Sequence, residues 1–253
     1  IALAPDGRRL AAGRRDGTVQ LCEVGAGGTA TLAPAESAVT QLAYSPDGFL
    51  LAVGRADGRV NVLDAPDAES GEEPHEYAAA DVGPGPVTAI AFDAFSERLL
   101  ATEGKGRSVL LDLEGDGPAV RLPPMQTAGW TAAAFSPDRT QVLTADATGL
   151  AALWDAADGR MLRAWQAARE PIAAVAYGTR PGELLTAGAR DVRVWSVHGD
   201  DAMWLRQIVP TGSEATRRAA FLGGGRHMAR VGESGRPQVV YSGPPFLVET
   251  WEE

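Results

Sequence analysis

The stretch "SPDGFLLAVGRADGRVNVLD" (residues 45–64) recurs along the chain in altered form, as "APDGRRLAAGRRDGTVQLCE", "SPDRTQVLTADATGLAALWD" and "TRPGELLTAGARDVRVWS". Aligning the turn after the first apolar run gives intervals of 41, 48, 43, 44 and 43 residues, and the aligned column holds Pro5, Pro46, Ala94, Pro137, Pro181 and Gly224. A period of this length is typical of repeat folds, in which each unit is one small element stacked on its neighbours. Six such units fill the 253 residues.

Each unit contains four short apolar runs separated by turn residues. In the second unit the runs are "VTQLAYS" (39–45), "FLLAVGR" (49–55), "RVNVLD" (59–64) and "HEYAAA" (75–80). Short runs rich in Val, Leu and aromatic residues, alternating with Asp-Gly turns, predict hairpin-linked strands. We therefore expect one four-stranded antiparallel meander per unit, with the other fourth strands at 30–33, 119–123, 161–166, 204–209 and 246–251.

A lone meander cannot cover both faces of its sheet, so units of this kind are stable only when they stack. Four strands in about 40 residues is the spacing of β-propeller blades. The sequence thus predicts an all-β propeller that occupies residues 1–253 as one domain, with blades at approximately 1–36, 37–84, 85–128, 129–169, 170–213 and 214–253.

The chain resembles the WD40 repeat family along nearly its whole length. The residues that carry the likeness are "AYSPDG" (43–48), "ADGRVNVLD" (56–64), "AFSPD" (134–138) and "LWDAADGR" (153–160). The family's blade-ending Trp-Asp dipeptide is matched outright only by Trp154-Asp155, and the other units have Cys22-Glu23, Leu63-Asp64, Leu111-Asp112, Trp195-Ser196 and Tyr241-Ser242. The resemblance implies a scaffold, often attached in bacteria to a signalling enzyme.

The resemblance also implies a buried chain of hydrogen bonds in each blade, from a His through a Ser or Thr and an Asp to the Trp. None of His75, His198 and His227 stands in the expected Gly-His position. The turn aspartate is present as Asp16 and Asp57, and shifted as Asp191, and a strand hydroxyl is present as Thr144. We expect this departure to affect the family subtype and to leave the fold unchanged.

Ring closure is open to two interpretations. The first unit begins within its innermost strand and the last ends after its own outer strand, so no spare strand remains to clasp the ring. We expect a seven-bladed parent protein, with another domain upstream of Ile1, and keep a closed six-bladed ring as the alternative.

The composition limits the cellular location, the source organism and the class of partner that we expect. The formal charge of −10 opposes binding to nucleic acid, because such binding depends on neutralising phosphates. The single cysteine requires no oxidising compartment, which favours the cytoplasm. Arginine supplies every cation except Lys105, and this bias with abundant Ala and Gly indicates a bacterial source. No apolar run approaches the ~20 residues that span a bilayer, so we expect no membrane insertion.

Candidate chemical sites are weak, and we predict no catalytic, cofactor-binding or metal-binding residue. Cys22 occupies the column that holds Trp in the family, so we expect a buried structural thiol. "GESGR" (232–236) is one residue short of a nucleophile elbow and lies in a hairpin. The three histidines fall in different blades without Cys partners. "EGKGRS" (103–108) lacks the strand-loop-helix setting of a phosphate loop.

Charge can be sorted by face, because successive turns of a meander alternate between the two ends of its strands. First and third turns share one face, which we call the first-turn face, and second turns lie on the other, the second-turn face. The third-turn segments 64–74, 112–117, 155–159 and 198–201 contain twelve carboxylates and no Lys or Arg. The second turns carry several cations, partly offset by Asp16, Asp57, Glu103, Asp146, Asp191 and Glu233.

Arginine is enriched at protein interfaces because its guanidinium pairs bidentately with carboxylates and stacks on aromatic rings. The sequence therefore predicts a protein partner at the second-turn face. The candidate partner-binding residues are Arg14, Arg15, Arg55, Lys105, Arg107, Arg190 and Arg236, together with Trp130, which has a competing interpretation as core. The leading function is a non-catalytic scaffold or sensor module. A phosphate- or nucleic-acid-reading propeller is the second, and a propeller enzyme the third.

Overall fold

The computed structural model consists of β-strands joined by turns. It describes residues 1–25, 28–32, 37–65, 74–115, 117–125, 129–178, 181–198, 202–210, 216, 218–222, 227–232, 234–241 and 248–250. The described strands form six four-stranded antiparallel sheets, and each sheet takes its strands in chain order. The predicted all-β propeller of four-stranded blades is thereby confirmed. Among the described residues, no helix has the length and apolarity needed to cross a membrane.

The first three blades span the N-terminal half of the chain. Blade 1 contains β1 (Ala2–Leu3), β2 (Arg9–Gly13), β3 (Val19–Glu23) and β4 (Thr29–Leu32). Blade 2 contains β5 (Val39–Tyr44), β6 (Leu50–Arg55), β7 (Arg59–Asp64) and β8 (Glu76–Asp81). Blade 3 contains β9 (Val87–Phe92), β10 (Arg98–Glu103), β11 (Ser108–Asp112) and β12 (Val120–Leu122).

The other three blades repeat this order. Blade 4 contains β13 (Trp130–Phe135), β14 (Gln141–Asp146), β15 (Leu150–Asp155) and β16 (Met161–Gln166). Blade 5 contains β17 (Ile172–Tyr177), β18 (Glu183–Gly188), β19 (Asp191–His198) and β20 (Ala202–Pro210). Blade 6 contains β21 (Arg218–Leu222), β22 (His227–Val231), β23 (Pro237–Tyr241) and β24 (Val248–Thr250).

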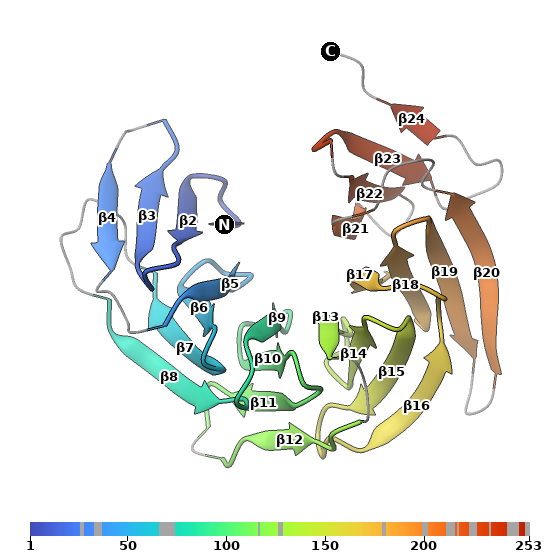
Figure 1. Ribbon diagram of the computed structural model, residues 1–253, viewed down its shortest axis with the longest axis horizontal. Coiled ribbons are helices and arrows are strands. Elements are labelled where there is room, and N and C mark those ends of the chain that lie inside the picture. Colours follow the sequence, from blue (N-terminus) through green and yellow to red (C-terminus); the bar gives the residue numbers. More distant parts are fainter. Residues whose placement is uncertain are drawn as a thin grey trace.

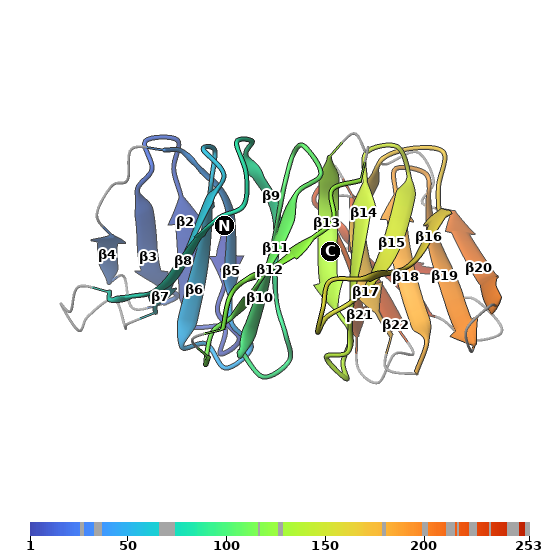
Figure 2. The same ribbon diagram turned by 90° about the horizontal axis from the view of Figure 1, so that it is seen from below.

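The blades are arranged radially, with the first strand of each nearest the centre and the fourth at the periphery (Figure 1). Seen from the side, the turns form two opposite faces with the strands running between them (Figure 2). The six blades follow an arc, and blades 1 and 6 stand on either side of its opening rather than next to each other (Figure 1). The seven-bladed parent remains a prediction.

The second strand of an inner blade is buried along most of its length because a neighbouring sheet covers each of its faces. In β6, every residue from Leu51 to Arg55 is buried. In β2, by contrast, only Ala11 is buried. Leu10 and its cross-strand partner Cys22 are only partly buried, and Figure 1 shows the opening of the arc on the side of blade 1 away from blade 2. Cys22 is therefore half-buried, and the expected fully buried thiol is wrong.

The recurring Ser-Pro-Asp phrase closes the first turn. The Ser45 hydroxyl donates to Asp47 Oδ1 at 2.6 Å and accepts from the Leu50 N–H at 2.9 Å. Ser136 and Asp138 repeat the 2.6 Å bond in blade 4. The next position has a positive φ in four blades, where it is Gly7, Gly48, Ser96 and Arg139. Glycine is the residue that adopts this conformation without steric cost, which explains the Asp-Gly signature.

Glycine in the second turn has a steric reason as well. A Cβ on Gly58 would lie 1.6 Å from the carbonyl oxygen of Gly83, in the connection to the next blade. A Cβ on Gly149 would lie 2.3 Å from the carbonyl oxygen of Ala168. These close approaches allow the Gly58 and Gly149 carbonyls to accept from Val82 and Ala167, respectively. The second turn and the inter-blade connection are thus locked together.

In blades 2 and 4 the residue at a bulge in the first strand hydrogen-bonds to the next blade. Pairing in β5 shifts register between Val39 and Gln41, so the bulged residue is Thr40. Its hydroxyl is within 2.8 Å of the Val87 carbonyl oxygen of blade 3, to which it donates. Thr131, at the equivalent bulge of blade 4, donates to the Ile172 carbonyl of blade 5 at 2.5 Å.

Two blades retain a shortened form of the buried hydrogen-bond chain. The Trp154 indole N–H donates to the Thr144 hydroxyl at 2.9 Å, and both residues are fully buried. Blade 5 repeats this contact between Trp195 and Thr186 at 3.0 Å, which the sequence analysis did not anticipate. The aspartates Asp16 and Asp57 instead accept backbone N–H groups within their own turns.

We expect Thr144→Val to lower the free energy of unfolding by about 1 to 3 kcal/mol, because it leaves the buried Trp154 N–H without an acceptor. In a Trp154→Phe background the same change should cost less than about 1 kcal/mol, since neither partner is then left unpaired. Denaturant unfolding of the four proteins measures the difference. Equal costs in both backgrounds would show that the hydrogen bond contributes nothing.

Acid should weaken the first turns. The pKa of Asp138 lies below its ordinary value, chiefly because the Ser136 hydroxyl donates to the carboxylate. For Asp47, burial disfavours ionisation, but bonds from Ser45 and Phe49 outweigh it and the pKa is again lowered. A lowered pKa in the folded state gives stability that is present above the unfolded value and lost as the pH falls through the folded one.

Asp47→Asn with Asp138→Asn should therefore lower the melting temperature at neutral pH and flatten its decline between about pH 4 and pH 2. Thermal unfolding across this range provides the measurement. A variant that loses stability in acid as steeply as the native protein would contradict the assignment.

Candidate interaction surface

Six of the predicted partner-binding residues are exposed on the second-turn face. Each lies in a short turn between the second and third strands of its blade, so its backbone position is fixed by the hairpin. The exposed residues are Arg14, Arg15, Lys105, Arg107, Arg190 and Arg236. Arg14 donates to Gln20 at 2.7 Å, and Arg190 lies 3.6 Å from Glu170 while its side chain remains 88% exposed. These side chains are accessible to a partner.

Arg55 differs from the other predicted arginines because it is buried, with 7% of its surface exposed. Its Nη1 donates to the carbonyl oxygens of Gly17 at 3.1 Å and Ser37 at 3.2 Å, and its Nε donates to Asn61. These bonds join the second turn of blade 1 to blade 2. The guanidinium is used inside the fold, so Arg55 is not part of the candidate surface.

Trp130 is a core residue. Its side chain is 1% exposed, its Nε1 donates to the Gly106 carbonyl oxygen at 3.0 Å, and its ring meets Trp154 edge-to-face at 6.0 Å between centroids. The indole thus packs between blades 3 and 4 and fastens the second turn of blade 3. The interpretation of Trp130 as a partner contact is wrong for the structure as it stands.

The second-turn face has further cations that the sequence analysis missed. Arg59, Arg121 and Arg169 are all exposed. Arg59 begins the third strand β7, Arg121 lies in the fourth strand β12, and Arg169 lies in the connection between blades 4 and 5. The connections between blades leave the fourth strands at the same end as the second turns, so a sorting by second turns alone overlooks them.

Most described carboxylates of the second-turn face are engaged within the protein. Asp146 is buried and accepts from Thr148 and Leu150, while Glu103 is buried and accepts from the Arg107 N–H. Glu103 Oε2 has no hydrogen-bond partner among the described residues. Asp191 lies 2.9 Å from the Arg193 guanidinium. Exposed positive charge therefore predominates on this face although the chain is acidic.

A pocket of about 420 Å³ opens where blades 2 and 3 meet on this face. Arg107 and Arg121 line it together with Asp57, Asp81 and the segment 82–84. Arg121 is held in place by donating to the Asp81 carbonyl oxygen at 2.9 Å. The pocket can receive a polar side chain of a partner beside the exposed Arg107.

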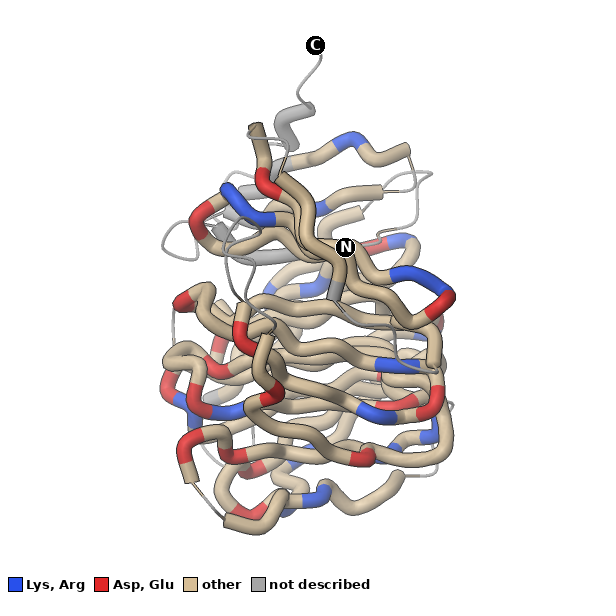
Figure 3. The backbone as a smooth tube through the Cα atoms, turned by 90° about the vertical axis from the view of Figure 1, so that its left-hand side faces the viewer, with Lys and Arg blue, Asp and Glu red and all other residues tan. Residues whose placement is uncertain are grey.

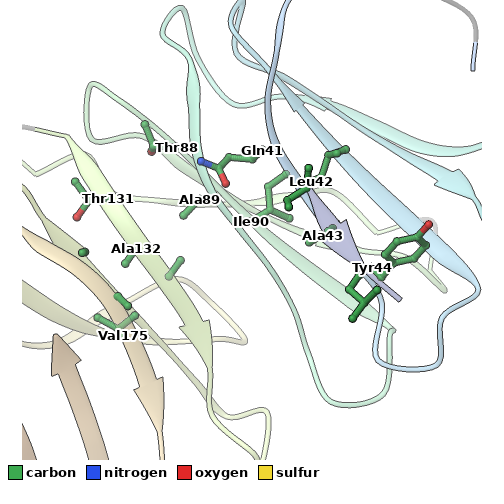
Figure 4. A pocket seen from close by; sticks show the side chains of 16 residues that line it. Gln41, Leu42, Ala43, Tyr44, Thr88, Ala89, Ile90, Thr131, Ala132 and Val175 are labelled. Carbon is green, nitrogen blue, oxygen red and sulfur yellow. The ribbon is translucent and has the colours of Figure 1, made fainter. Parts of the chain in front are cut away.

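The centre of the propeller holds a second cavity, of about 380 Å³, between the innermost strands (Figure 4). Alanines and other apolar residues from β1, β5, β9, β13 and β17 form most of its wall, and Gln41, Thr88 and Thr131 add polar groups. The side chains that line it within the described part of the chain are uncharged.

The first-turn face carries the third-turn carboxylates. Of those predicted, Asp64, Asp112, Glu114 and Asp158 are exposed, and Asp155 is partly buried. The predicted acidic residues within 66–73, Asp116, and residues 200 and 201 lie outside the described residues. Figure 3 shows the charged residues gathered at the two faces, with mostly uncharged strands between them.

The candidate chemical groups come together nowhere in the described part of the chain. Among those residues, no group of three His, Cys, Asp or Glu side chains is placed to hold a metal ion. His75 is exposed next to β8, while the side chains of His198 and His227 lie outside the described atoms. Residues 232 and 234–236 form the turn between β22 and β23, and 104–107 form the turn between β10 and β11.

We expect Arg55→Ala to lower the free energy of unfolding by about 1 to 3 kcal/mol, because the Gly17 and Ser37 carbonyls lose a buried donor. Arg15→Ala, in the neighbouring exposed turn, should change it by less than about 0.5 kcal/mol. Urea unfolding compares the two variants. Equal stabilities would show that Arg55 does not hold blades 1 and 2 together.

Comparison with known proteins gives one family match and many related folds. Residues 31–95 match the model of the anaphase-promoting complex subunit 4 WD40 domain. No curated protein sequence matches the chain. One similar solved chain comes from a crystal structure of the mitotic checkpoint complex, with a TM-score of 0.78 and 16% identity over 92% of this chain and 71% of that one. Another is the β-propeller domain of Cps50 (Swd1) from Myceliophteria thermophila, with a TM-score of 0.76 and 18% identity over 99% and 86% of the two chains.

The matched segment contains the motifs of the second unit, "AYSPDG" and "ADGRVNVLD". The solved structures are too distant in sequence to transfer a function, but they agree with the sheet order in showing the fold. The chain is therefore a β-propeller, with a match to a WD40 domain that centres on its second blade.

Proposed function

We propose that this propeller is a non-catalytic protein-interaction scaffold that binds an acidic region of a partner protein through its second-turn face. The observation that carries the proposal is the concentration of exposed cations there, on a chain whose formal charge is −10. A positive surface on an acidic protein attracts a negative partner patch in a defined orientation, while the rest of the molecule repels it.

The arrangement of the cations favours a protein over a nucleic acid. Nearly all are arginines, whose planar guanidinium pairs bidentately with a carboxylate. The first-turn face is acidic and would oppose the approach of a long polyanion. One of the similar structures is a complex of proteins by its name, which agrees with a scaffold function. A phosphate-reading propeller is the second candidate, and it rests on the same arginines.

The finer role follows from the sequence. We propose that the chain is the recognition or sensing part of a larger bacterial signalling protein that acts in the cytoplasm. The preference for arginine over lysine and the lone Cys22 support this setting. The absence of any candidate nucleophile with a paired base in the sequence motifs supports a role in binding.

The test compares two double variants that change net charge equally. Arg15→Glu with Arg107→Glu alters the second-turn face, and Arg8→Glu with Arg160→Glu alters exposed arginines of the first-turn face. The probe is a peptide rich in glutamate, and calorimetric titration measures its affinity. We expect the first variant to weaken binding at least about tenfold and the second to leave it within about twofold.

Equal losses in the two variants would overturn the proposal, because they would show a response to net charge alone. A single-stranded DNA oligonucleotide is the second probe. Tighter binding of the oligonucleotide than of the peptide, lost in the first variant only, would assign the arginines to phosphate recognition instead.

A further inference from the structure

Two phenylalanines are exposed on the first-turn face, away from the arginines. Phe49 is 72% exposed and Phe95 is 63% exposed. They belong to the first turns of blades 2 and 3, which are neighbours in the arc. Single exposed apolar residues are normal on a protein surface, but two exposed rings in adjacent turns form a larger apolar patch, and aromatic residues are enriched in protein interfaces.

Phe95 stands where the repeat places an aspartate. The corresponding residues of blades 1, 2 and 4 are Asp6, Asp47 and Asp138, which accept backbone N–H groups in their turns. In blade 3 the buried Asp93 takes over this task and accepts from Glu97 and Arg98. The turn is therefore closed without Phe95, and its ring is left in solvent. The hydrogen bonds of the turn do not require an aromatic residue here, and the contact of its ring with the Arg139 guanidinium of blade 4 leaves most of Phe95 exposed.

The two turns are held in contact. The Asp47 N–H donates to Ser96 Oγ at 3.4 Å, which connects the turn of Phe49 to the turn of Phe95. The third turns lie against them, since Ala65 donates to the Phe49 carbonyl oxygen and Leu113 to that of Glu97, both at 2.8 Å. Both phenylalanines consequently share one patch with the start of the third turns.

Carboxylates surround this patch. Asp64 precedes Ala65, and Asp112 and Glu114 flank Leu113, so these three exposed carboxylates and the exposed Asp47 lie next to the phenylalanines. Of the nearby cations, Arg98 is partly buried and faces Asp112 across the sheet, and two others make direct contacts within the fold. Arg9 donates to the Gly48 and Ala65 carbonyls, and Arg139 pairs with Asp93 and Glu97.

Arg139 also shows what these rings can bind. Its guanidinium carbon lies 4.8 Å from the centroid of Phe95 while its nitrogens contact the carboxylates of Asp93 and Glu97. A cation over an aromatic face with carboxylates at its edge is a favourable arrangement for arginine or lysine. Phe49 offers a similar exposed ring, with Asp47 and Asp64 close to it in the turns.

We propose that Phe49 and Phe95, with Asp47, Asp64, Asp112 and Glu114, form a second docking surface that binds a basic segment of a partner protein. Arginine or lysine side chains of that segment lie on the phenylalanine rings and pair with the carboxylates, and their aliphatic stems cover the exposed apolar surface. We call these six residues the aromatic-acidic surface. The propeller then binds an acidic partner on one face and a basic one on the other.

The test uses a peptide of alternating arginine and alanine, with a glutamate-alanine peptide as the negative control. Fluorescence anisotropy of the labelled peptide measures affinity. Phe49→Ala with Phe95→Ala should weaken binding of the arginine peptide about five- to tenfold. Asp64→Asn with Asp112→Asn should weaken it too and reduce its dependence on salt. Phe49→Trp with Phe95→Trp keeps both aromatic faces and should retain the native affinity.

Three results would overturn the proposal. One is native affinity of the Phe49→Ala, Phe95→Ala variant for the arginine peptide. That result would show that the peptide is attracted only by the negative charge of the protein. Another is a dimer of the native protein, seen by sedimentation, that the same variant dissociates, because the surface would then bind a second copy. The last is a loss of affinity for the arginine peptide in Arg15→Glu with Arg107→Glu that equals the loss in the phenylalanine-to-alanine variant. The arginine-to-glutamate variant also separates this surface from the second-turn face, since it should bind the arginine peptide with native affinity or better.

Discussion

The whole structure depends on covering both faces of each small sheet. A four-stranded meander has apolar side chains on both sides of its second strand, and only another sheet can exclude water from them. Each of blades 2 to 5 has a neighbouring blade on both sides, which is why β6 is buried from Leu51 to Arg55. The threonines at the first-strand bulges, Thr40 and Thr131, then fix neighbouring blades by hydrogen bonds near the centre.

The difference in charge between the faces follows from how turns use their carboxylates. An aspartate that closes a turn keeps its charge, but its oxygen atoms are directed at backbone N–H groups. On the second-turn face this occurs at Asp16 and Asp57, which are exposed, whereas Glu103 and Asp146 are buried. Arginines in the same turns, apart from Arg55, stay exposed even where they contact a neighbour, as Arg14 contacts Gln20 and Arg190 contacts Glu170. Exposed positive charge thus remains as a by-product of turn formation.

The repeat period and the hairpin turns predicted the architecture well, because strand pairing in a meander is local and each unit shows the same pattern. Thr144 was identified as a strand hydroxyl, and the structure gives it the expected Trp154 partner. Longer-range facts were not predictable. The burial of Arg55 depends on the carbonyls of Gly17 in blade 1 and of Ser37 just before β5, and the half-buried Cys22 depends on a face that no sheet covers.

The candidate surfaces were predictable only in part. Sorting charges by turn placed six cations on one face correctly, since the ends of hairpin strands alternate. It missed Arg121 and Arg169, whose segments are not second turns. The exposure of Phe49 and Phe95 was not predicted from the sequence, because an aromatic residue between two apolar runs usually indicates core. Only the structure shows that Asp93 closes this turn, a role that belongs in other blades to the aspartate at the position of Phe95.

The tight fit of Gly58 against the Gly83 carbonyl, and of Gly149 against that of Ala168, makes the two faces unequal in their tolerance of change. In blades 2 and 4 the second turn joins its strands across a short gap, from Arg55 to Arg59 and from Asp146 to Leu150, and an added residue there would break this contact. Third turns differ more in length, from the gap between His198 and Ala202 to that between Asp64 and Glu76. Third turns of the first-turn face can therefore take up new recognition sequences by insertion more readily than the second turns of blades 2 and 4, where substitution preserves the glycine contact.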